Sequence, residues 1–241
     1  MRALFFLFAV VACDSQLRSD PRPDPPPPPP PADPAVQRDM NAHFDAGAAV
    51  RAAIVAGDVA AARAGFESLA SSAAPEGLPA GSEPLFVAMI GAARQGAGAS
   101  TAAQQAVALG DTLRACGGCH ALVHARPAWR VPAAPSRDPG IQLHMARHAW
   151  AVDRMVEGLV GPTEAGWAQA SAILRDEPVD AAELSRGLSL SPEAAAAGER
   201  LHQLGLEARQ ATTAEARSAA FAETLTTCAT CHVAVRSGPP R

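Results

Sequence analysis

The 241-residue chain contains no tyrosine, and aromatic residues make up only 4% of it. β-Branched residues are also sparse and alanine is abundant, which favours helices over a β-sandwich or barrel. With 20 basic and 24 acidic residues and no basic run, the chain lacks the charge pattern of a nucleic-acid-binding protein. Because aromatic side chains supply much of the buried area of most cores, we expect something else to fill part of this one.

The N-terminal segment has the pattern of an exported, anchored protein. Residues 3–12 form an apolar run of signal-peptide length, too short to span a bilayer as a stable helix, and Cys13 follows directly. This end resembles the lipobox of bacterial lipoproteins, in which the cysteine carries lipid; an ordinary signal peptide with an incidental cysteine is the alternative. Residues 14–34 are rich in proline and predict a polyproline II spacer without a core.

The remainder of the chain predicts the same helical unit twice, over residues 35–128 and 138–241. The string Gln-x-x-Met-x-x-His ends at His43 and again 105 residues later at His148. Each string lies on an apolar stripe with steps of four and three, which is typical of the inner face of a helix in a bundle. The stripes comprise Val36, Met40, His43, Gly47, Val50 and Ile54 in the first unit, and Ile141, Met145, His148, Val152, Met155 and Leu159 in the second.

The rest of each unit predicts three further helices. The last helices carry matching stripes 112 residues apart, ending at His120 and His232. Proline-rich residues 127–140 form the joint between the units, and Ser191 followed by Pro192 predicts a helix start. We therefore expect an all-α protein with two tandem four-helix bundles. The middle helices are expected at 58–73, 83–95, 163–175 and 192–212, with the extra length of the second unit at 176–191.

The chemistry resides in two Cys-x-x-Cys-His motifs, the attachment signature of c-type haem. On a helix, positions i, i+3 and i+4 share one face, so two thiols can bond one haem while the adjacent imidazole reaches its iron. The four cysteines outside the leader are all used in these motifs. The motifs comprise Cys116, Cys119 and His120 in the first unit, and Cys228, Cys231 and His232 in the second.

Other uses of the cysteines fit the spacing less well. Zinc sites built from Cys-x-x-Cys usually have a second ligand pair within about 20 residues, whereas these pairs lie 112 residues apart. A thioredoxin-like pair requires a βαβ setting, and a disulfide across one helical turn would constrain almost no loop.

With these motifs, residues 35–241 resemble two tandem copies of class II c-type cytochromes, the cytochrome c-prime group. The resemblance implies a four-helix bundle with the motif near the end of its last helix. It also implies two covalent haems, bound by Cys116 and Cys119 and by Cys228 and Cys231, with His120 and His232 as proximal iron ligands. Members of that family are typically single units, so its dimer interface does not transfer to a duplicated chain.

In that family the first helix faces the other side of the iron. Met40 and His43 offer two distal ligands in the first unit, and Met145 and His148 offer the same two in the second. Core packing would also explain a methionine or histidine on an apolar stripe, but both recur at one register in two diverged copies. Methionine, histidine and an open site remain the three alternatives. The histidines without a repeat counterpart, such as His144 and His202, are expected to be structural or exposed.

Together these features predict a diheme electron carrier that is tethered through Cys13 in the periplasm or cell envelope and exchanges electrons with redox partner proteins. A gas-binding haem protein with an open axial site is the alternative. The sequence has no Ser-His-Asp arrangement, phosphate loop or nucleotide fingerprint, and a diheme peroxidase would need acid/base residues that no pattern suggests, so we expect no enzyme.

Overall fold

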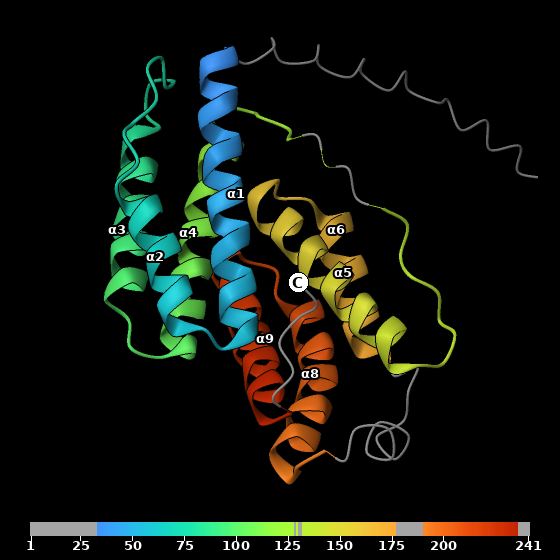
Figure 1. The fold of residues 1–241 in the computed structure, drawn as a ribbon. Coiled ribbons are helices and arrows are strands. Elements are labelled where there is room, and N and C mark those ends of the chain that lie inside the picture. Colours follow the sequence, from blue (N-terminus) through green and yellow to red (C-terminus); the bar gives the residue numbers. More distant parts are fainter. Residues whose placement is uncertain (1–32, 128, 130–131, 177–189, 236–241) are drawn as a thin grey trace, which may run out of the picture. The chain divides into compact units, whose positions relative to one another are not determined.

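The described residues form helices joined by turns and short segments (Figure 1). The computed structural model describes residues 33–127, 129, 132–176 and 190–235. The expected all-α class is confirmed over this part of the chain. Its helices are α1 (Pro34–Ala56), α2 (Val59–Ala70), α3 (Glu83–Gly98), α4 (Ala102–Leu122), α5 (Ile141–Val160), α6 (Glu164–Arg175), α8 (Pro192–Gln210) and α9 (Ala214–Ala234). Cys13, the spacer up to residue 32 and most of the expected long loop lie outside the described residues.

Short polar side chains define where the helices begin. The expected start at Ser191 is confirmed, because its side chain accepts a hydrogen bond from the amide of Ala194 and Pro192 is the first helical residue. Thr101 and Thr213 cap α4 and α9 in the same way. Each cap pairs one of the amides that lack a partner in the first helical turn.

Two pairs of helices match in length and register between the halves. Helices α4 and α9 both have 21 residues, and their bounds differ by 112. Helices α2 and α6 both have 12 residues, and their bounds differ by 105. The structure therefore shows both offsets found in the sequence, one at the second helix of each half and one at the last.

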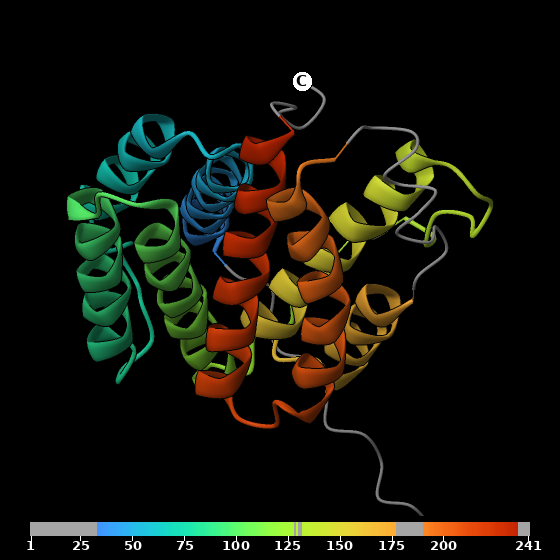
Figure 2. The same cartoon turned by 90° about the horizontal axis from the view of Figure 1, so that it is seen from below.

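The two halves share one core. Residues Pro31–Arg241 form a single compact unit, with α4 and α9 side by side at its centre (Figure 2). Helix α1 packs against α2 and contacts α9 more extensively than it contacts α4. Helix α5 packs against α6 and contacts α4 more extensively than α9. Of the two last helices, the first helix of each half thus contacts that of the other half more extensively, and a division into two separate bundles stays a prediction.

Small residues allow α4 and α9 to approach each other. A Cβ atom on Gly110 would lie 2.9 Å from the carbonyl oxygen of Ser218 and 2.8 Å from its hydroxyl. Because a backbone carbonyl cannot rotate aside as a flexible side chain can, glycine at position 110 sets the separation of the two helices.

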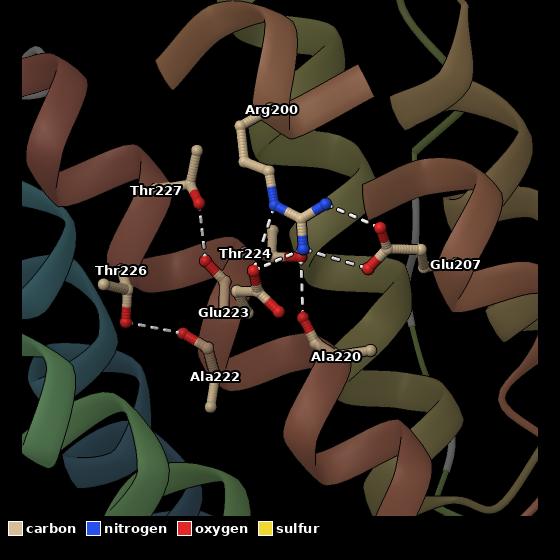
Figure 3. A network of polar contacts seen from close by, with 8 residues as sticks. All are labelled: Arg200, Glu207, Ala220, Ala222, Glu223, Thr224, Thr226 and Thr227. Atoms are coloured by element: carbon tan, nitrogen blue, oxygen red, sulfur yellow. Dashed lines mark hydrogen bonds and ion pairs between the residues drawn. The ribbon is translucent and has the colours of Figure 1, made fainter. Parts of the chain in front are cut away.

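A polar network joins α9 to α8 (Figure 3). The guanidinium of Arg200 on α8 contacts the carboxylates of Glu207, at 2.6 and 3.0 Å, and of Glu223 on α9. These side chains are exposed enough that such pairs add little to stability. The network mainly helps to fix the register of α8 against α9.

Among the described helices, none combines the length and the apolar character needed to cross a membrane.

We predict that Gly110→Ala lowers the free energy of unfolding by ~1–2 kcal/mol, because the new methyl group forces α4 and α9 apart. The matched control is Gly198→Ala on α8, where a Cβ atom meets no atom within 4 Å. There the same change should stabilise the chain by ~0.5–1 kcal/mol through helix propensity. Chemical denaturation of both variants measures the two effects, and equal effects would contradict the close-approach explanation.

Candidate functional site

The two Cys-x-x-Cys-His motifs occupy the last turns of α4 and α9. Equal helix lengths and matching threonine caps place both motifs at the same distance from the helix start. Cys116 and Cys228 are half-buried and pack against the shared apolar core. The structure thus brings each pair of thiols and its following histidine to one helix face, as the spacing predicts.

Each motif histidine forms a hydrogen bond that orients its ring. The Nδ1 atom of His120 lies 2.8 Å from the carbonyl oxygen of Val160, and Nδ1 of His232 lies 3.0 Å from that of Val55. A carbonyl oxygen only accepts, so Nδ1 carries the proton and donates. In the neutral ring Nε2 then keeps its lone pair, which is the form in which imidazole binds a metal.

The acceptors of these bonds come from the opposite half of the molecule. Val55 lies in the last turn of α1 and Val160 ends α5, and they are 105 residues apart. Carbonyl groups at a helix C-terminus have no partner within the helix. The motif histidines provide one, so each of the two first helices ends against the motif of the other repeat.

Gly117 makes the first of these approaches possible. A Cβ atom at this position would lie 1.9 Å from the carbonyl oxygen of Leu159 on α5. The first of the two residues between the cysteines therefore has to be glycine for α4 to meet α5 as it does. In α9 the same position holds Ala229, which is buried.

Burial controls the state of the thiols. It raises the pKa of Cys116 to about 12, and the neighbouring Cys119 raises it further. Burial likewise raises the pKa of Cys228 to about 12, with Cys231 adding to the effect. Since only the thiolate is a good nucleophile, these two sulfurs are protonated and unreactive near neutral pH.

The distal candidates of the first half lie on α1. Met40 and His43 are both half-buried, and the ring centroid of His43 is 6.3 Å from that of Phe86 on α3. Nδ1 of His43 is buried, with no hydrogen-bond partner among the described residues. Burial lowers the pKa of His43, against an opposing effect of Asp39. One turn further along, a Cβ atom on the buried Gly47 would meet no atom within 4 Å, which leaves open space beside this stripe.

The distal candidates of the second half lie on α5. His148 is buried, and its Nε2 atom has no partner in the described part of the chain. Burial lowers the pKa of His148 well below its usual value, and the charges of neighbouring groups, His232 among them, lower it further. Helix α5, which carries His148, contacts α9, which carries the motif histidine of the same half. Met145 is half-buried.

His148 lies in a cluster of histidines that the sequence pattern did not predict. His144 on α5 and His202 on α8 lie beside it, with ring centroids 4.1 and 5.5 Å away. His144 is buried, so of the two expected roles, structural or exposed, the exposed one does not apply to it. The four-residue spacing of His144 and His148 was the signal that could have indicated a pair on one helix face.

A cavity borders α4 on the side away from the thiols. It measures about 660 Å³ and is bordered on α4 by Asp111, Arg114, Gly117, Gly118 and Ala121. At 100° per residue these positions face away from Cys116, Cys119 and His120. The cavity therefore does not identify the motif site, which rests on the thiols, the histidines and the first helices.

Comparison of the chain with protein-family models, curated proteins and solved structures found no match. The arguments about function thus depend on the residues and their geometry.

We predict that iodoacetamide modifies Cys119 and Cys231 before Cys116 and Cys228 in the folded chain when all four thiols are free. Burial raises the pKa of all four thiols, but only those of Cys116 and Cys228 reach about 12. Cys116 and Cys228 therefore have the smaller thiolate fraction at pH 8. Site-resolved mass spectrometry over time gives the order. In guanidinium chloride the four rates should converge, and equal rates in the folded chain would contradict the prediction.

Proposed function

We propose that this chain is a diheme c-type cytochrome that carries electrons at the periplasmic or outer face of a bacterial membrane. The observation that carries the proposal is the repeated motif together with its ring orientation. In both halves the motif histidine donates Nδ1–H to a carbonyl and leaves Nε2 available. Two unrelated structural histidines would have no reason to share this arrangement at matching positions.

Three further observations fit a covalently bound haem. The thiols of each pair lie on the same helix face as their histidine. Met40 and Met145 are half-buried on the stripes where a distal ligand is expected. The space beside Gly47 and the scarcity of aromatic side chains leave room for a large flat apolar group.

Each group of the chain would have a separate task. Cys116, Cys119, Cys228 and Cys231 would anchor two haems through thioether bonds, and His120 and His232 would bind the irons. When bound, the haem supplies a one-electron redox centre. The carbonyl groups of Val55 and Val160 hold the ligand rings in position and increase their basicity through the Nδ1–H bonds. The surrounding apolar core limits water and thereby tunes the potential.

The N-terminal residues would keep the carrier at the membrane. Lipid on Cys13 would anchor the chain, and the proline-rich residues 14–34 would hold the helices away from the surface as a semi-rigid spacer. The partners would be redox proteins in the same compartment. This tethering rests on the sequence pattern, since Cys13 lies outside the described residues.

We predict two covalent haems per chain in the purified protein, measured by alkaline pyridine haemochrome spectroscopy. Replacing Cys116 and Cys119 together by serine should leave one haem, and so should the same change at Cys228 and Cys231, because each pair anchors its own group. Cys13→Ser is the matched control and should keep both haems while the chain leaves the membrane fraction. Zero or one haem in the unaltered chain would refute the proposal.

We predict His/Met ligation at both irons in the oxidised protein, because His148 lies in a cluster with two other histidines and leaves Met145 as the ligand of its half. Low-temperature EPR with near-infrared magnetic circular dichroism identifies the ligand pair. Met40→Leu should change the spectrum of one haem, whereas His43→Leu should not. A bis-histidine signal would contradict this assignment, and high-spin iron that responds to carbon monoxide would favour the gas-binding alternative.

A further inference from the structure

Three histidines meet between α5 and α8. His144 and His148 lie one turn apart on α5, and His202 faces them from α8. One ring nitrogen from each lies within 4.8 Å of those of the other two. His144 is 3% exposed and His148 is 8% exposed, so the cluster is closed off from solvent on the α5 side.

The hydrogen bonds of the cluster leave its nitrogens unused. Nδ1 of His202 donates to the carbonyl oxygen of Leu174 at 2.7 Å, which keeps the lone pair on Nε2. Nδ1 of His144 and Nε2 of His148 are buried without a partner in the described part of the chain. Buried polar atoms almost always have a partner. Two such nitrogens in one place, beside a third that is oriented by a backbone carbonyl, indicate that a ligand is missing.

We propose that His144, His148 and His202 bind one divalent transition-metal ion of the zinc class. Two histidines four residues apart on a helix are a common metal-binding pair. A third ligand from a facing helix completes a three-histidine site and leaves a fourth position open. With metal–nitrogen distances of about 2.0–2.1 Å, the nitrogens would close to roughly 3.3 Å, a contraction that small side-chain rotations can supply.

The nature of the ligands narrows the choice of ion. The cluster offers imidazole nitrogen and neither sulfur nor carboxylate, which suits zinc, copper or nickel better than magnesium or calcium. Arg147, the residue before His148, carries the main positive charge that would oppose the binding of a cation. Its guanidinium bonds to the carbonyl oxygen of Pro135 at 3.1 Å and to the carboxylate of Asp176 at 2.5 Å, so it is paired within the joint and the loop after α6.

The cluster belongs to the second half alone. At the same offsets, the first half has Asp39 in place of His144 and Ile90 in place of His202. The site uses no residue of the Cys-x-x-Cys-His motifs and shares only His148 with the duplicated stripe, so it goes beyond the proposed electron-carrying function. Because His148 would serve this ion, Met145 remains as the distal ligand candidate of the second half.

The test is titration of the full purified chain with Zn²⁺, by isothermal titration calorimetry and by metal content after dialysis. His202→Ile, which installs the residue of the first half, should weaken binding of one Zn²⁺ at least about 100-fold. His144→Asn should do the same. The matched control, His124→Asn, alters an exposed histidine at the end of α4 and should bind as the unaltered chain does. Far-UV circular dichroism verifies that each variant is folded.

The outcomes separate this proposal from the proposed function. Motif cysteines without haem can also bind Zn²⁺, so the ion assigned to the cluster is the one that His202→Ile removes. If the purified chain carries no haem and His202→Ile removes this Zn²⁺, the cluster is supported and only the cytochrome proposal is rejected. If the chain carries two haems and His202→Ile leaves Zn²⁺ binding unchanged, the metal-site proposal is overturned. Absence of Zn²⁺ binding by the unaltered chain overturns it as well.

Discussion

The exchange of hydrogen bonds between the halves is the constraint from which the rest of the arrangement follows. His120 donates to the end of α5, and His232 donates to the end of α1. Both bonds use carbonyl groups that a helix terminus leaves unpaired, so each half completes the other. For both to form at once, α4 and α9 have to lie side by side, which explains the glycine at position 110. The approach of α4 to α5 in turn explains Gly117, whose missing side chain admits a carbonyl group.

Local features of the sequence predicted the helices well. The expected segments 83–95 and 163–175 agree with α3 and α6 to within three residues, because helical periodicity and, at α3, a proline in the first turn act over short stretches of chain. The choice of partner for the first helices could not be predicted. Both first helices carry the same apolar stripe and both last helices present the same face. A duplicated pattern therefore does not specify whether α1 pairs with α4 or with α9, and only the packing of the whole unit decides.

The site shows the same division between local and distant information. Cys116 and His120 follow from spacing within one helix, so the sequence was sufficient to place them together. The partner of the His120 ring is a carbonyl group 40 residues away, and no residue type signals a carbonyl acceptor. The histidine cluster was missed for a related reason. His202 was set aside because it lacks a counterpart in the first half, yet a site that arose after duplication would lack one by its nature.

The composition of the core connects these observations. Among the described residues, the apolar core contains Phe66, Phe221 and Trp167 but consists largely of alanine, leucine and valine. Alanine lets helices approach closely, at the expense of buried apolar area per residue. A core of this kind gains less from its own side chains than an aromatic one does, so any group that binds between its helices would contribute a larger share of the stability. The duplicated motif and the single histidine cluster both lie where helices of the unit meet. Loading either site would therefore join helices that small side chains alone hold weakly.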